Sequence, residues 1–110
     1  MDITSSVQAL SALAQSTRLH TFRLLTQHEL SGMAAGDIAR TLAIPQNTLS
    51  THLAILSQAG LIKATRCSRS IVYRANLDRI RELTLFLLKD CCHGRAEICA
   101  PLMADLASCC

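Results

Sequence analysis

The chain has 110 residues, a length that fits one domain and leaves little room for a second. Half of the residues are hydrophobic but only 3% are aromatic, so the core must be built from Leu, Ile and Ala, which favours a mainly α-helical fold. A chain this short buries only about two-thirds of the surface that its unfolded state exposes. The surplus of apolar residues therefore predicts a homodimer.

The sequence also bears on where the protein works. No apolar run approaches the roughly 20 residues of a membrane span, and no basic segment precedes an apolar stretch at the N-terminus. We therefore expect a cytoplasmic protein without membrane contact.

Four of the six cysteines form two adjacent pairs. Adjacent cysteines bridge each other poorly, because their Cα atoms lie only ~3.8 Å apart and an unstrained disulfide needs more. Free thiols in a reducing compartment favour binding of soft metal or metalloid ions, with redox sensing as the next explanation.

The net charge of +3 is unevenly distributed. Residues 38–77 contain no Asp or Glu, but they include Arg40, Lys63, Arg66, Arg69 and Arg74. Such a one-sided segment predicts a polyanion as partner. On charge alone, a solvated basic surface without function is the alternative.

Helical spacing of apolar residues predicts two helices in the first third of the chain. The first is an amphipathic helix over residues 4–14, marked by Ile3, Val7, Leu10 and Ala14. The second, over residues 17–28, has Ser16 or Thr17 as its expected N-cap and ends near Ser31-Gly32. Its inward-facing residues are expected to be Leu19, Phe22, Leu24 and Leu25.

Two further helices are separated by a proline. A short helix over residues 35–43 precedes Pro45, and because proline is tolerated in the first turn of a helix, Pro45 starts the next one, over residues 45–58. Gly60 ends it. Its inward face is expected to carry Leu49, Leu53 and Leu56, and its opposite face Asn47, Ser50, Thr51, Ala54 and Gln58.

The last third predicts a hairpin, a helix and a tail. Two β-rich runs surround a basic turn within residues 61–75. Asn76 caps a fifth helix that is expected to end at Gly94 and that holds Leu77, Ile80, Leu83, Leu87 and Leu88. Residues 95–110 are expected to form a tail with at most one weak helical turn, opened by Pro101. The expected organisation is a DNA-binding and dimerisation domain over residues 1–94 and a tail over residues 95–110.

This order of elements is the layout of a winged helix-turn-helix, a mainly α fold with a small β-hairpin. In it, the second helix of the pair enters the major groove of DNA and the hairpin rests on flanking phosphates. Amide and hydroxyl groups pair with base edges, so the polar face of residues 45–58 suits base readout, with an inert polar face as the alternative. Arg66 and Arg69 are predicted phosphate contacts. His52, at the border of the core face, is expected to be packed and hydrogen-bonded.

The segment from Ile44 to Ile62 resembles the recognition helix and strand entry of the ArsR/SmtB family of metal-responsive repressors. Residues 14–19 and 69–74 are similar to further family positions, so the resemblance extends over residues 10–92. It implies a homodimeric repressor of double-stranded operator DNA whose first and last helices form the interface. The positions that match the family's base contacts are Gln46, Asn47, Ser50 and Thr51.

The sensing site differs between family members. Residues 33–37 lack the Cys-x-Cys pair of many arsenic-responsive members, and the last helix offers only Asp90 and His93 for a zinc-type site. What remains resembles a subgroup of arsenic repressors with a Cys-Cys pair at the end of the last helix and a third cysteine further on, here Cys91, Cys92 and Cys99. Three thiolates suit As(III) or Sb(III), because soft sulfur ligands select soft ions.

The spacing of these cysteines requires a chain reversal. If residues 92–99 were helical, the sulfurs of Cys92 and Cys99 would lie about 10 Å apart along the axis, whereas thiolates that share one ion lie within about 4.6 Å of each other. The helix must therefore end, and Gly94 gives Cys99 the freedom to fold back. Burial of Cys91 and Cys92 in the dimer interface is the alternative interpretation.

We therefore predict an As(III)- or Sb(III)-responsive repressor that binds operator DNA as an apo homodimer and releases it when the metalloid binds three thiolates. A zinc- or cadmium-responsive repressor and a thiol redox-sensing regulator are the alternatives. No organic cofactor is expected. An enzyme is not expected either, since the sequence shows no Ser/His/Asp set, glycine-rich phosphate loop or convergent carboxylate pair.

Overall fold

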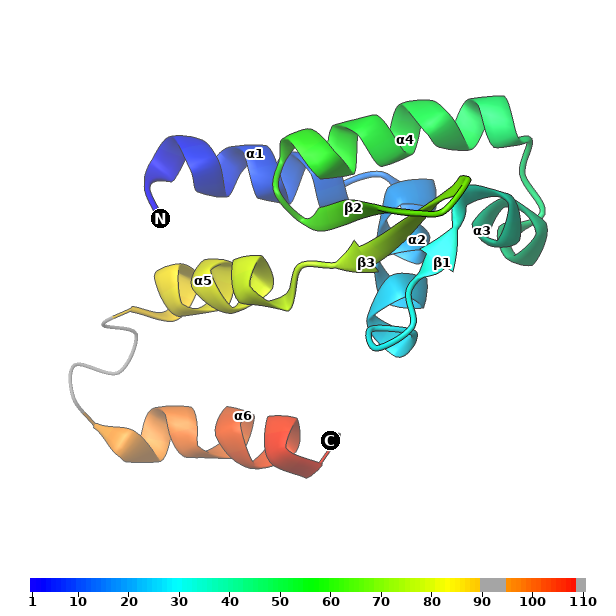
Figure 1. The fold of residues 1–110 in the computed structure, drawn as a ribbon. Helices are drawn as coiled ribbons and strands as arrows, with labels where there is room; N and C mark the ends of the chain where they lie inside the picture. The colour runs from blue at the N-terminus through cyan, green and yellow to red at the C-terminus, as the bar shows by residue number, and fades with distance from the viewer. Residues whose placement is uncertain (90–94, 109–110) are drawn as a thin grey trace.

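The structure is a computed structural model that describes residues 1–89 and 95–108. Within these ranges the chain forms six helices and a three-stranded antiparallel sheet, in the order α1, α2, β1, α3, α4, β2, β3, α5, α6 (Figure 1). The fold is the predicted winged helix-turn-helix, mainly helical with a small hairpin.

The first two helices, α1 (Ile3–Leu13) and α2 (Ser16–Gln27), lie within one residue of their predicted bounds. The predicted cap of α2 was wrong: Gln15 is the N-cap, and its side chain accepts a hydrogen bond from the Arg18 backbone N–H at 2.9 Å. Leu19 was also misplaced, because it is 44% exposed. At ~3.6 residues per turn it lies about 120° around the helix axis from the buried Leu25.

The helix-turn-helix consists of α3 (Ala35–Leu42) and α4 (Gln46–Gln58). Ala43 ends α3 in the left-handed region with φ of 56°, which turns the chain sharply. Pro45 is the N-cap of α4 and not its first helical residue, so the helix begins one residue later than predicted. The predicted inward residues of α4 are confirmed as buried: Leu49, Leu53 and Leu56.

The predicted hairpin consists of β2 (Ile62–Cys67) and β3 (Ser70–Ala75), with Ile62 opposite Ala75 and Cys67 opposite Ser70. Its turn has two residues, and Ser68 adopts the positive φ of 60° that such tight turns require. A third strand, β1 (Met33–Ala34), was not predicted, because two residues are too few to show a period. It pairs with β3 and so attaches the hairpin to the start of α3.

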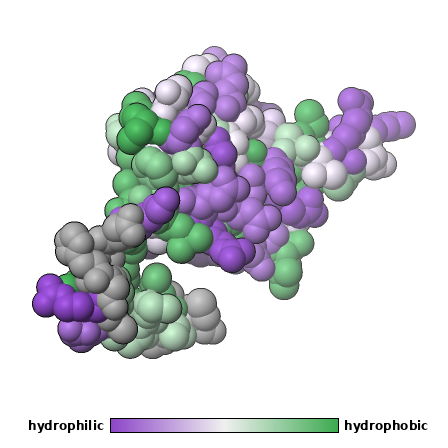
Figure 2. All heavy atoms as spheres, turned by 90° about the vertical axis from the view of Figure 1, so that its left-hand side faces the viewer, coloured by the Kyte–Doolittle hydropathy of each residue, from purple (hydrophilic) through white to green (hydrophobic). Residues whose placement is uncertain are grey.

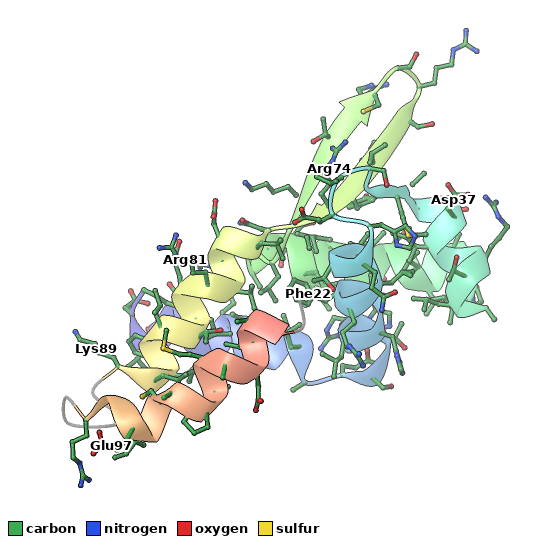
Figure 3. The ribbon with its side chains drawn as sticks, turned by 90° about the horizontal axis from the view of Figure 1, so that it is seen from below. Phe22, Asp37, Arg74, Arg81, Lys89 and Glu97 are labelled. Carbon is green, nitrogen blue, oxygen red and sulfur yellow. The ribbon has the colours of Figure 1, made fainter. Side chains whose placement is uncertain are left out.

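The sequence predicted the end of the chain least well. The helix α5 (Leu77–Leu88) ends at the extended Lys89, before the predicted stop at Gly94, which lies outside the described residues. The expected tail contains a full helix, α6 (Ala96–Ser108), with Pro101 inside it, so the prediction of one weak turn was wrong. In Figures 1 and 3, α6 runs back alongside α5.

The hydrophobic core is formed by α1 to α5 and the sheet, and Phe22 of α2, labelled in Figure 3, is part of it. The small residues Ala9 and Ala12 are the core residues of α1. The larger apolar residues of this helix lie on its outer face, where Ile3 is 67% exposed, Val7 58% and Leu10 41%. The apolar stripe that predicted α1 therefore has no partner in the described part of the chain. In residues 1–89 and 95–108, no helix combines the length and apolar character that crossing a membrane requires.

Candidate functional site

The outer face of α4 carries all four predicted base-contact residues, and all four are exposed: Gln46, Asn47, Ser50 and Thr51. Two of them are oriented by local hydrogen bonds. Asn47 Oδ1 accepts from the Thr48 backbone N–H at 3.0 Å, and Ser50 Oγ donates to the Gln46 carbonyl at 3.0 Å. The amide of Asn47 keeps its two N–H donors and the hydroxyl of Ser50 keeps its acceptor lone pairs.

The hairpin of β2 and β3 is the second part of the site. Arg66 and Arg69, predicted to contact phosphate, are exposed at its tip, where Arg69 occupies the turn and Arg66 lies opposite Ile71. Arg74 lies near the other end of the hairpin (Figure 3). It donates from Nη2 to the Ser31 carbonyl at 3.4 Å, so this arginine contributes to the fold beside the α2–β1 turn rather than to the tip.

A groove of about 420 Å³ separates the start of α4 from the hairpin. It brings together three predicted residues from distant parts of the sequence, namely Gln46, Ser50 and Arg69. The other three predicted residues, Asn47, Thr51 and Arg66, are not among the described residues that line the groove. Tyr73 lines the groove and was missed by the sequence analysis. The two-residue alternation of β3 places it on the same face as Ile71, which also lines the groove, and this could have revealed it.

The surface around this groove favours an anion. Neither α4 nor the hairpin contains an acidic residue. The last carboxylate before α4 in the sequence, Asp37 of α3, is labelled in Figure 3 and forms an ion pair with Arg40 of the same helix. The positive charges of Arg66 and Arg69 are therefore not offset by a carboxylate of the elements that carry the site.

His52 is half-buried, and its Nδ1 lies 3.3 Å from Nη1 of Arg18. A guanidinium can only donate, so Nδ1 is the acceptor in this contact. This confirms the expectation of a packed, hydrogen-bonded histidine.

The predicted thiol site is described only in part. Cys99 is half-buried on α6 and lines an apolar groove of about 690 Å³ between α5 and α6, with Leu85, Leu88 and Leu102. Cys91 and Cys92 lie outside the described residues. Within those residues, no three His, Cys, Asp or Glu side chains are close enough together to hold a metal ion.

A helix-turn-helix whose second helix exposes a polar, carboxylate-free face beside a basic hairpin defines the class of winged-helix DNA-binding regulators. Comparison with known proteins agrees. Residues 13–64 match a helix-turn-helix domain family. The chain is also 32% identical over 78 residues to the uncharacterized HTH-type transcriptional regulator MJ1325 of Methanocaldococcus jannaschii, which covers 71% of this chain and 85% of that protein.

Two solved structures extend this likeness. The homodimeric winged helix-turn-helix domain of Mb0332 from Mycobacterium bovis, a possible ArsR-family regulator, is 28% identical, covers 78% of each chain and has a TM-score of 0.66. The AntR antimony-specific transcriptional repressor is 28% identical, with coverage of 74% of this chain and 72% of that one and a TM-score of 0.59. This chain belongs to the ArsR/SmtB family of winged-helix transcriptional regulators.

Proposed function

We propose that the protein is a homodimeric repressor that reads operator DNA with α4 and the hairpin and releases it when As(III) or Sb(III) binds Cys91, Cys92 and Cys99. The observation that carries the DNA-binding part is the groove that joins Gln46 and Ser50 of α4 to Arg69 of the hairpin and that has no acidic residue in its lining. Side chains of α4 then contact base edges, and Arg66 and Arg69 contact phosphates.

The homodimer is supported by apolar side chains that the described chain leaves exposed. They lie on α1, where Val7 is 58% exposed, and on α5, where Leu85 and Leu87 are also exposed. Figure 2 shows hydrophobic side chains among polar ones on the side of the molecule where α1 begins and α5 ends. A second copy that covers both helices would remove this apolar surface from water. The related Mb0332 domain is homodimeric, which supports a homodimer here as well.

The choice of inducer rests on the chemistry of the three thiols and on the relationship to the antimony-specific AntR. Arsenous acid would exchange its three hydroxyl groups for three thiolates, and each departing hydroxyl would leave as water with a thiol proton. In Figures 1 and 3, α6 runs in the opposite direction to α5, which supports a return of the chain after α5. The partial burial of Cys99 limits competition from solvent for its thiolate.

Release of DNA then requires coupling between the thiols and α4. This coupling is reciprocal, so bound DNA must weaken metalloid binding by the same factor by which the metalloid weakens DNA binding. The three cysteines follow α5 in the sequence, and the exposed leucines of α5 belong to the proposed interface. A change in dimer packing that displaces the two copies of α4 is the proposed route.

The test is release of a fluorescent duplex that the protein has selected from a random pool. Arsenite should release the wild-type protein and the Cys67→Ser variant, whose substituted thiol is exposed on the hairpin. Cys99→Ser should bind the duplex as well as the wild-type protein and remain bound in arsenite. Release of Cys99→Ser by arsenite would refute the site, and release of the wild-type protein by zinc, cadmium or peroxide but not arsenite would replace the proposed inducer.

A further inference from the structure

Arg18 of α2 connects two helices that have different tasks in the proposed function. Its Nε donates to the Ala12 carbonyl at 2.6 Å, and its Nη2 donates to the Ser11 carbonyl at 3.5 Å. Both carbonyls belong to the last turn of α1, where the usual i+4 donors are missing. The Ser11 carbonyl also accepts from the Ala14 backbone N–H at 3.2 Å. On the other side, Nη1 donates to Nδ1 of His52 on α4.

The cation suits this position. The last turn of α1 contains no basic residue of its own, although the end of a helix carries partial negative charge. Arg18 supplies the missing positive charge from a neighbouring helix, and its planar fork of donors reaches both the carbonyls and the imidazole at once. A lysine could keep the charge but could not make both connections with one ammonium group.

His52 is well placed to orient α4. It lies within α4, one residue after the exposed Thr51 and one before the buried Leu53, at the border between the polar face and the core. A second connection joins the same two helices, because Gln8 of α1 donates from Nε2 to the Gln58 carbonyl at 3.4 Å. Figure 1 shows α1 and α4 along the same edge of the molecule. These hydrogen bonds therefore fix the orientation of α4 relative to α1.

We propose that Arg18 and His52 form a positioning pair that fixes α4 relative to α1 and thereby selects the spacing between the two half-sites of the operator. This inference rests on the proposed function, because α1 belongs to the proposed dimer interface. In a twofold dimer, the separation of the two reading helices sets the separation of the half-sites. Any small rotation of α4 against α1 would occur in both copies, so it would change the separation of the two α4 helices and with it the preferred separation of the half-sites.

The experiment measures spacing selectivity. The wild-type protein first selects a duplex from a random pool, and a series of duplexes then varies only the number of base pairs between the two half-sites. The measured quantity is the ratio of affinities for the preferred spacing and for its neighbours. His52→Ala should lower this ratio about fivefold, the effect expected for loss of one hydrogen bond of ordinary strength. Arg18→Lys should lower it similarly.

Two variants separate positioning from a general loss of structure. His52→Asn places an amide oxygen where Nδ1 stands, so it should restore the acceptor and the wild-type ratio. His20→Ala removes an exposed histidine from α2 and should leave the ratio unchanged. A His52→Asn ratio as low as that of His52→Ala, or an unchanged ratio in Arg18→Lys, would overturn the inference. If His52→Ala does not fold, Arg18→Lys and His52→Asn decide it.

Failure of the proposed function has a different signature. A wild-type protein that enriches no duplex from the pool would refute DNA recognition, and the inference with it. A wild-type protein that enriches a duplex with two half-sites, together with variants that keep its spacing ratio, would refute only the role of Arg18 and His52.

Discussion

Asn76 Nδ2 donates to the Gly60 carbonyl at 2.9 Å, which joins the start of α5 to the end of α4. The Asn76 backbone N–H adds a hydrogen bond to the Leu61 carbonyl at 2.8 Å, and Arg79 Nε reaches the Ala59 carbonyl at 3.4 Å. The three bonds satisfy the carbonyls of residues 59–61, which directly follow α4, with donors from α5 and the residue before it. These bonds connect the start of α5 to the segment that directly follows α4.

Asn76→Ala should destabilise the protein by about 1 kcal/mol, because it leaves a part-buried carbonyl without its side-chain donor. Urea denaturation followed by circular dichroism measures this change in the free energy of unfolding. Gln27→Ala is the matched control, since it removes an exposed amide from the end of α2 and should change stability by less than about 0.5 kcal/mol. Equal destabilisation by the two variants would show that the bond to Gly60 contributes nothing.

Ser50→Ala should weaken binding of the selected duplex by about tenfold, the discrimination expected from one polar contact to a base edge. Alanine is the better helix former, so the substitution should not reduce the stability of α4. Ser57→Ala makes the same chemical change at an exposed position near the other end of α4, outside the proposed contact, and should leave the affinity unchanged. Fluorescence anisotropy on one labelled duplex compares the two variants. Equal affinities would remove Ser50 from the proposed interface.

The sequence predicted the elements whose apolar residues repeat over several turns, such as α4 with Leu49, Leu53 and Leu56. It failed where packing between elements decides. The two-residue strand β1 is defined by its pairing with β3, and the helix α6 continues through Pro101, a residue that disfavours a helix interior. The apolar stripe of α1 was recognised correctly, but periodicity does not reveal whether such a stripe faces its own core or a second copy.

The candidate site shows the same division. The polar face of α4 and the arginines of the hairpin were visible in the sequence because residue type and helical period suffice to place them. The groove that unites Gln46 with Arg69, and the bond from Arg18 to His52 across 34 residues of sequence, depend on tertiary packing. No local pattern encodes such distances, so only the structure could show them.

Arg69→Ala should weaken binding to selected and unrelated duplexes by similar factors, because a phosphate contact carries no base information. It should also reduce the slope of log affinity against log salt by about 1, the value for one lost phosphate neutralisation. Arg23→Ala, an exposed arginine of α2, is the control and should leave the slope unchanged. If Ser50→Ala weakens binding of the selected duplex alone and Arg69→Ala weakens binding of both duplexes, Ser50 contacts a base and Arg69 contacts a phosphate. A salt slope unchanged by Arg69→Ala would contradict the phosphate contact.

Val7→Glu should convert the dimer to a monomer, because it places a carboxylate in the centre of the exposed apolar stripe of α1, where burial of an unpaired charge is costly. Sedimentation velocity measures the oligomeric state. A monomer holds only one half-site, so affinity for the selected duplex should fall by about a hundredfold through loss of bivalency. Leu30→Glu makes a comparable change at a residue that is 89% exposed after α2, away from α1 and α5, and should leave both dimer and affinity intact. A Val7→Glu protein that still sediments as a dimer would place the interface elsewhere.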